Sequence, residues 1–78
     1  MLTLDIFPNP SSDKISLDLG GVEIADLVVY DILGNEILSI PNYSNKSEID
    51  IINYSIDTYT IQIQTSTGNM SQRLLVNS

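Results

Sequence analysis

The stretch Tyr59-Thr60-Ile61-Gln62-Ile63 alternates strictly between apolar and polar side chains. Because a β-strand places successive side chains on opposite faces, this stretch predicts a strand with one face in the core and one in solvent. The same period of two recurs along the chain. The other alternating runs are residues 2–6, 15–19, 49–51 and 70–76, with a weaker one at 36–40. In the last strong run, the residues expected on one face are Met70, Gln72, Leu74 and Val76.

Residues 22–33 are ambiguous, since their apolar positions also fit the stripe of a helix. Their content of Ile, Val and Tyr favours a pleated surface, and a pair of glycines breaks the chain just before them. We therefore expect a strand here. Leu27 and Val29 should point to the core, with Val28 and Tyr30 on the other face.

Turn signals separate these runs at intervals of about ten residues, the spacing typical of an all-β sandwich. Asp31-Ile32-Leu33-Gly34 has the Asp and Gly preferences of a type I turn that ends in a residue tolerating positive φ, and Ser66-Thr67-Gly68-Asn69 is similar. Residues 41–47 and 53–55 have the composition of loops. The whole pattern predicts an all-β fold, an Ig-like β-sandwich of about seven mainly antiparallel strands in two sheets, with no helix longer than one turn.

Length and charge narrow the possible functions. A chain of 78 residues is expected to be a single domain, residues 1–78. Its net charge is −7, and the only cations to oppose ten carboxylates are Lys14, Lys46 and Arg73. Affinity for nucleic acid comes from clustered Lys and Arg, so nucleic-acid binding is excluded, and an anionic membrane surface would repel the chain.

The residue types give no support for catalysis. The chain has neither His nor Cys, so its serines lack the base that a nucleophilic triad needs. Asp26 and Asp31 could approach each other as a carboxylate pair, but the sequence predicts no cleft around them. No dense acidic run suited to calcium is present. We expect no enzyme, no metal and no cofactor.

The chain contains, in this order, the segments Phe7-Pro8-Asn9-Pro10, Val29 to Gly34, Thr58 to Ile63, and Gln72-Arg73-Leu74-Leu75-Val76. In their order and spacing these four segments resemble the C-terminal sorting domain (type A) of proteins exported by the type IX secretion system of Bacteroidetes. Two prolines, which cannot pair within a central strand, end the first strand. This chain has Asn35 where the family often has Lys, and Asp57 in place of the Gly in the family's Gly-x-Tyr motif. The residues expected to carry recognition or fold are Pro8, Asn9, Pro10, Asp31, Gly34, Tyr59, Gly68, Arg73, Leu74, Leu75 and Val76.

The resemblance implies a non-catalytic signal domain that is covalently linked to an upstream cargo. We expect the domain to be monomeric. Its partners would be an outer-membrane translocon, a β-barrel shuttle protein and a surface sortase that removes the domain. The cargo would pass through the periplasm to the cell surface or the medium. We further expect the terminal strand, Arg73 to Val76, to offer an edge to which a partner adds a strand.

An alternative from another class is an Ig-like or fibronectin-like accessory module that binds carbohydrate or protein for a secreted enzyme. Sandwich folds host many functions, so the fold alone cannot separate the two. Tyr43 and Tyr54 are expected in loops, where their rings could stack on a sugar. The N-terminus lacks the layout of a signal peptide, so we expect a fragment of a longer precursor, with Met1 as an expression start.

Overall fold

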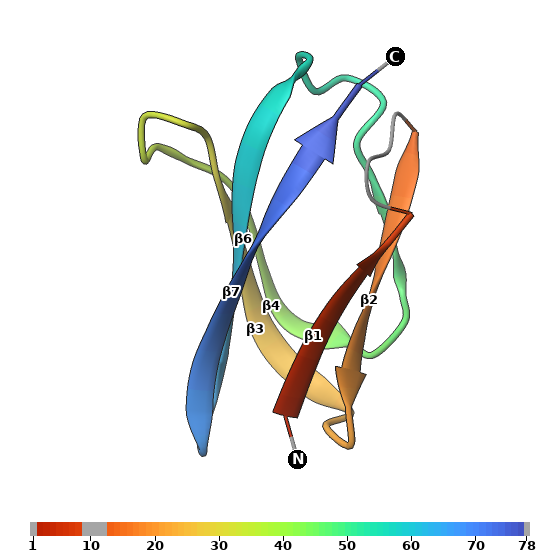
Figure 1. Cartoon of the computed structure of the whole chain (residues 1–78). Coiled ribbons are helices and arrows are strands. Elements are labelled where there is room, and N and C mark those ends of the chain that lie inside the picture. Colours follow the sequence, from red (N-terminus) through yellow and green to blue (C-terminus); the bar gives the residue numbers. More distant parts are fainter. Residues whose placement is uncertain (1, 9–12, 78) are drawn as a thin grey trace.

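The computed structural model describes residues 2–8 and 13–77, which form seven strands and no helix (Figure 1). Every pairing between these strands is antiparallel. The predicted all-β fold of seven antiparallel strands is therefore confirmed. The strands are β1 (Leu2–Phe7), β2 (Lys14–Gly20), β3 (Ile24–Tyr30), β4 (Glu36–Ser44), β5 (Glu48–Asp50), β6 (Asp57–Thr65) and β7 (Gly68–Val76).

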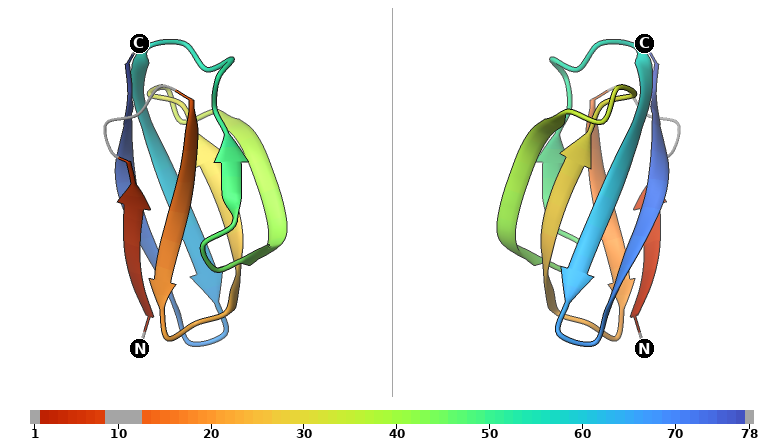
Figure 2. Two further views of the ribbon diagram at one scale, coloured as in Figure 1. Left: turned by 90° about the vertical axis from the view of Figure 1, so that its right-hand side faces the viewer. Right: turned by 90° about the vertical axis from the view of Figure 1, so that its left-hand side faces the viewer.

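Two sheets form the sandwich, one with the order β1-β2-β5 and one with the order β4-β3-β6-β7. The two layers face each other in both side views (Figure 2). The chain crosses between the sheets after β2, β4 and β5, so that each layer is assembled from distant segments. β7 and β1 are edge strands of different sheets and lie beside each other where the layers meet (Figure 1).

The core lies between the layers and consists of the residues at alternate positions of the strands. Ile61 and Ile63 in β6 are fully buried, as the alternation predicted. Leu27 and Val29 in β3 are buried too, which confirms that residues 22–33 form a strand and a turn rather than a helix. The buried hydrophobic residues are Leu4, Ile6, Ile15, Leu17, Leu19, Ala25, Leu27, Val29, Tyr43, Ile49, Ile51, Tyr59, Ile61, Ile63, Leu74 and Val76.

The face predicted for β7 is only half buried. Leu74 and Val76 are in the core, whereas Met70 and Gln72 on the same face are exposed. The opposing sheet has three strands against four, so it cannot cover the whole inner face of the larger sheet. The exposed half of β7 is the half that follows the β6–β7 turn.

β4 is longer than the sequence predicted, because the expected loop at residues 41–47 begins only after Ser44. Pro41 and Asn42 form an irregularity in which Asn42 has a φ of 58° and its N–H donates to a carboxylate oxygen of Asp26 at 3.1 Å. Edge strands tolerate proline at such a position, so the strand continues past it. As a consequence Tyr43 is buried in the sandwich.

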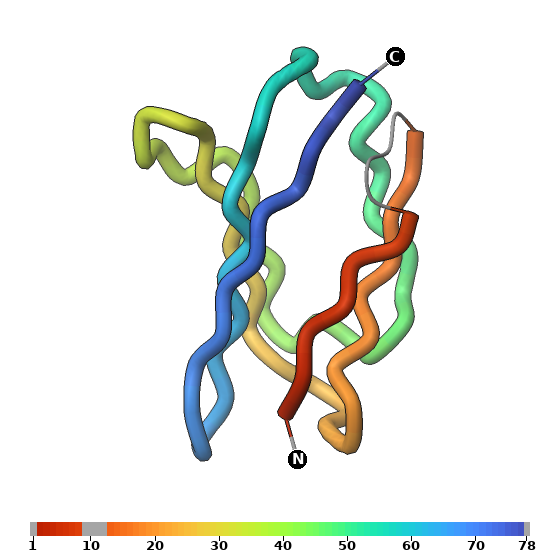
Figure 3. Tube along the Cα trace, viewed as in Figure 1, coloured from red at the N-terminus to blue at the C-terminus, as the bar shows by residue number. Residues whose placement is uncertain are grey.

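The long axis of the molecule separates the two chain ends. The sandwich measures 33 × 22 × 16 Å, and β1 starts at the end opposite to the one where β7 finishes (Figure 3). The β3–β4 hairpin projects at the same end as the finish of β7 (Figure 3). Pro8 follows β1 through a cis peptide bond, while the predicted motif residues Asn9 and Pro10 lie outside the described residues.

Candidate functional site

The described residues contain no group of three or more His, Cys, Asp or Glu side chains that could hold a metal ion. Within the same residues no helix is long and apolar enough to cross a membrane. The candidate site lies at the β3–β4 hairpin and includes several of the motif residues.

Asp31 holds the β3–β4 turn together. The Gly34 N–H donates to the Asp31 carbonyl at 3.0 Å, and the Asp31 N–H donates to the Asn35 carbonyl at 2.9 Å. The Asp31 carboxylate accepts from the N–H groups of Leu33 at 2.9 Å and Asn35 at 2.8 Å. Gly34 has a φ of +86°, a conformation that costs glycine least. The predicted turn, with its positive-φ glycine, is confirmed.

The electrostatics of the turn follow from these bonds. Hydrogen bonds stabilise the charged form of a carboxylate, and the one from the Asn35 backbone N–H is the main cause that lowers the pKa of Asp31 below its usual value. The Asn35 side-chain amide adds a bond to the other carboxylate oxygen at 3.2 Å. Asn35, which stands where the family often has Lys, therefore donates to the Asp31 carboxylate from both its backbone N–H and its side-chain amide.

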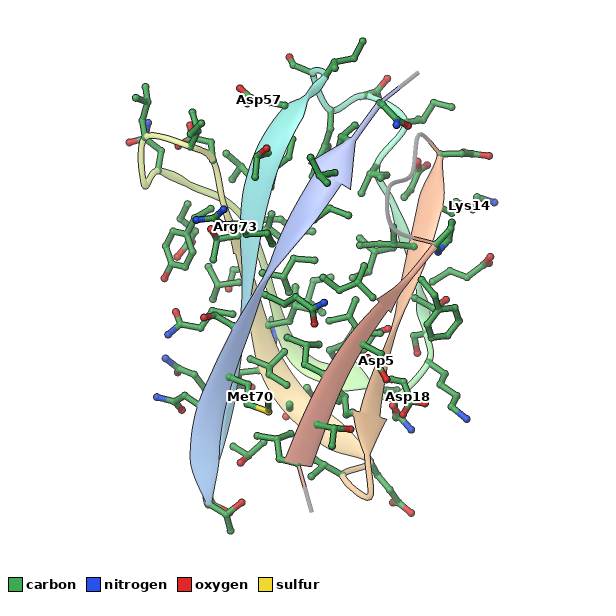
Figure 4. All side chains as sticks on the ribbon, in the orientation of Figure 1. Asp5, Lys14, Asp18, Asp57, Met70 and Arg73 are labelled. Atoms are coloured by element: carbon green, nitrogen blue, oxygen red, sulfur yellow. The ribbon has the colours of Figure 1, made fainter. Side chains whose placement is uncertain are left out.

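A hollow of about 540 Å³ lies beneath this hairpin, on the outer face of the four-stranded sheet. Strand register explains why distant residues meet there, since Tyr30 pairs with Thr60, which in turn pairs with Arg73. In Figure 4 the Arg73 side chain reaches over β6 on the side of the β3–β4 hairpin. The hollow is lined by Tyr30, Asp31, Ile32, Gly34, Thr58, Thr60 and Arg73.

The structure thus brings three of the four sequence motifs together, since Thr58 and Thr60 of the third motif also line the hollow. Asp31 and Gly34 from the turn and Arg73 from the last strand line the same hollow, although about forty residues separate them in the chain. The sequence alone assigned no role to Tyr30, Thr58 or Thr60 in a site. They lie within two of the quoted segments and on the outward face of alternating strands, but without the register between β3, β6 and β7 neither signal places them together.

Tyr59 lies on the opposite, inner face of the same sheet. It is buried, and its hydroxyl donates to the Ser55 carbonyl at 2.7 Å, four residues upstream. A tyrosine near the start of a strand that bonds back to the preceding loop is a feature of Ig-like sandwiches. Its ring also packs against Tyr54, with centroids 5.2 Å apart. The predicted role of Tyr59 as a packing anchor is consistent with this position.

The other motif residues within the described part of the chain do not line the hollow. Gly68 begins β7 after the β6–β7 turn, at the other end of the sheet, and Pro8 follows the edge strand of the other sheet. Within the terminal motif, Leu74 and Val76 are in the core while Leu75 is half exposed on the outer face. The terminal motif therefore has one face for packing and one face toward solvent.

The two tyrosines that could have stacked on a sugar in the alternative module, Tyr43 and Tyr54, do not form an exposed platform. Tyr43 was predicted in a loop, but it lies in β4, and its hydroxyl accepts from the Leu17 N–H at 3.0 Å and donates to the Ser47 carbonyl. Tyr54 does lie in a loop, yet its ring packs on the core and its hydroxyl is buried. Both rings therefore pack against the core rather than facing solvent.

Comparison with known protein families gives a match over nearly the whole chain. The family model of the secretion system C-terminal sorting domain matches residues 5–77, from within β1 to just beyond the end of β7. Among curated proteins no relative matches the chain. The matched range includes the hairpin turn, Tyr59 and the terminal strand, the features on which the sequence resemblance rests. The chain belongs to the secretion system C-terminal sorting domain family, the signal domains of the type IX secretion system.

Proposed function

We propose that residues 1–78 act as one folded domain that the type IX machinery recognises at the end of a longer cargo protein. The family is a non-catalytic secretion signal, and its cargo is secreted or displayed at the cell surface. The finer assignment concerns the partners. These are an outer-membrane translocon, a β-barrel shuttle protein that holds the domain, and a surface sortase that removes it from the cargo.

One observation carries this proposal: the family match extends across the entire sandwich rather than over a short peptide. The family's motifs in this chain are parts of both sheets and of their connecting turns. A linear signal would need only one of these segments to be exposed. Recognition of a folded unit explains why the family's sequence pattern extends over the whole domain rather than over one segment.

The arrangement of the chain ends agrees with such a role. A cargo placed before Leu2 enters at one end of the sandwich, whereas the β3–β4 hairpin and the finish of β7 lie at the other (Figure 1). The cargo therefore leaves the far end of the domain accessible to the secretion machinery.

The test is a secreted reporter fused before residues 1–78 and expressed in a type IX-competent bacterium. We expect the fusion to reach the surface or medium, to lose the domain there, and to stay in the periplasm of a strain that lacks the translocon. An Ile61→Asp version, which places a charge at a fully buried position, should also stay behind. If the intact fusion stays in the periplasm while the reporter with a host sorting domain is exported, the function becomes that of a carbohydrate- or protein-binding accessory module.

A further inference from the structure

A second hollow, of about 410 Å³, lies on the outer face of the four-stranded sheet, at the end of the sandwich where the chain begins (Figure 2, right). It shares no lining residue with the hollow beneath the β3–β4 hairpin. The lining residues are Ile24, Ala25, Asp26, Asn42, Gln64, Thr65, Ser66 and Asn69. None of them belongs to the four motif segments, so the sorting function leaves this hollow unexplained.

Four of these residues form a single row across the sheet. Asp26 of β3 pairs with Gln64 of β6, which in turn pairs with Asn69 of β7. On the other side, the Asp26 carboxylate accepts from the Asn42 N–H of β4 at 3.1 Å. Neighbouring strands lie about 4.8 Å apart, so the row is about 14 Å long. Polar side chains are therefore available along the whole width of the sheet.

The residue types of this row are unfavourable for strands. Asn and Asp are depleted in strands, yet Asp26, Asn42 and Asn69 all lie in this one row. The ladder between β3 and β4 shifts register between Ala25 and Leu27, and such irregularities re-aim side chains. Asn42 has a φ of 58°. Residues that break local rules in this way are expected where function requires them, and strand formation alone does not explain the row.

The row presents hydrogen-bonding groups that the fold does not use. Among the hydrogen bonds of the described residues, none involves the side-chain amides of Asn42, Gln64 and Asn69. A planar amide carries a donor and an acceptor side by side, and a hydroxyl group can do both, so one amide can pair with two neighbouring hydroxyl groups of a ligand. Ile24, which is 53% exposed, adds apolar surface to the lining. Convergent polar groups beside apolar surface are typical of ligand sites.

Charge restricts the class of ligand further. Among the described residues that line the hollow, Asp26 is the only charged one. A phosphate, sulfate or carboxylate ligand would find no Lys or Arg there to pair with. A metal ion requires several oxygen ligands, whereas the lining offers a single carboxylate that already accepts from the Asn42 N–H. The hollow is therefore complementary to a neutral ligand that is rich in hydroxyl groups.

We propose that this hollow binds a neutral oligosaccharide. The side-chain amides of Asn42, Gln64 and Asn69 pair with its hydroxyl groups, and Ile24 packs against the C–H face of a sugar ring. The length of the row suits a chain of sugars rather than a single ring. The site differs from a tyrosine platform, because it uses amides on a sheet instead of rings in loops. It goes beyond the proposed function and does not depend on it.

The experiment is an NMR titration of the isotope-labelled chain with maltotetraose, cellotetraose, xylotetraose and mannotetraose. Each is added up to about 10 mM, which detects dissociation constants in the millimolar range. We expect at least one probe to shift the side-chain amide signals of Asn42, Gln64 and Asn69, and to leave that of Asn35, at the other hollow, in place. Gln64→Ala should weaken binding about fivefold. Gln72→Ala, the matched control at an exposed position on the opposite face of the sheet, should bind like the parent.

The proposal is overturned if none of these probes shifts the amides of the row, or if Gln64→Ala and Gln72→Ala weaken binding equally. Tighter binding of tetragalacturonic acid, which is anionic, than of the neutral probes would overturn it too. If the same amides shift with protein concentration alone, the hollow is a contact between copies of the chain and the proposal fails. All these readouts use the isolated chain, so they are distinct from export of the reporter fusion, which tests the sorting function.

Discussion

Removing the hydroxyl of Tyr43 should destabilise the domain, whereas removing the hydroxyl of Tyr54 should not. The Tyr43 hydroxyl joins the two sheets, because it accepts from the Leu17 N–H of β2 at 3.0 Å and donates to the Ser47 carbonyl beyond β4. In Tyr43→Phe the Leu17 N–H remains at a residue with 0% exposure and has lost this acceptor. A buried donor left without a partner costs about 1 to 3 kcal/mol.

Tyr54 provides the matched control, since its hydroxyl is buried and has no hydrogen-bond partner. Tyr54→Phe deletes a group that is already unsatisfied while it keeps the ring contact with Tyr59. We expect its free energy of unfolding to be unchanged or higher by up to about 1 kcal/mol. Each variant lacks one hydroxyl oxygen relative to the parent. The difference between their free energies of unfolding therefore isolates the hydrogen bonds of the Tyr43 hydroxyl.

Thermal and urea unfolding, followed by circular dichroism, measure both variants. For a domain of this size each kcal/mol shifts the melting temperature by about 4 to 8 °C, so the two variants are easily resolved. A loss in Tyr43→Phe no larger than that in Tyr54→Phe would refute the assigned bridge between the sheets.

The same tyrosines predict how stability depends on alkaline pH. Burial is the main cause that raises the pKa of both Tyr43 and Tyr54, and Tyr59 adds to the effect at Tyr54. A folded pKa above the unfolded value of 10.0 means that the folded state holds its proton more tightly. This stabilisation is complete below pH 10.0 and is lost as the pH rises through the folded pKa. The free energy of unfolding of Tyr54→Phe should therefore fall less steeply with rising alkaline pH than that of the parent domain.

Three further predictions concern the core and the hairpin. Ile61→Ala removes a side chain with 0% exposure and should cost about 2 to 5 kcal/mol in urea unfolding; a loss below half a kcal/mol would mean that the facing of β6 is wrong. Gly34→Val should lower the free energy of unfolding by about 1 to 2 kcal/mol more than Asn35→Val does, because Gly34 has a positive φ that strains a residue with a Cβ. No atom lies within 4 Å of that Cβ, so the cost is backbone strain alone. Equal melting temperatures for the two variants would contradict the turn. The pKa of Asp31 is lower in the folded state than its unfolded value of 3.8, so its charged form stabilises the hairpin fully at any pH above 3.8. This contribution is lost as the pH falls through the folded pKa. An NMR titration of Asp31 with a midpoint at or above 3.8 would disprove it.

Sequence reasoning predicted the elements whose signals are local. Alternation placed Ile61 and Ile63 in the core, and turn chemistry placed Gly34 at positive φ. It failed at Pro41 and Asn42, which have the composition of a loop but form an irregularity in an edge strand. The Asn42 N–H pairs with Asp26, sixteen residues away, and the ladder between β3 and β4 resumes at Tyr43.

The candidate site could be predicted in its parts but not in its assembly. Asp31, Gly34 and Arg73 were identified from motifs, and each lies where its local pattern requires. Their meeting depends on the order β3-β6-β7 and on the register that sets Tyr30 opposite Thr60 and Thr60 opposite Arg73. Register is a tertiary property, and a shift of one residue would have turned these side chains into the core.

The structure also changes how the terminal motif must be tested. We expected the last strand to be an edge that a partner extends, and removal of residues 74–78 would be the simplest way to examine this. Leu74 and Val76 are buried, however, and they pair with Tyr59 and Asp57 of β6. The deletion would therefore remove core side chains and unfold the domain, so loss of export would not distinguish recognition from folding. Substitutions on the outward face, at Arg73 and Leu75, keep the core and separate the two contributions.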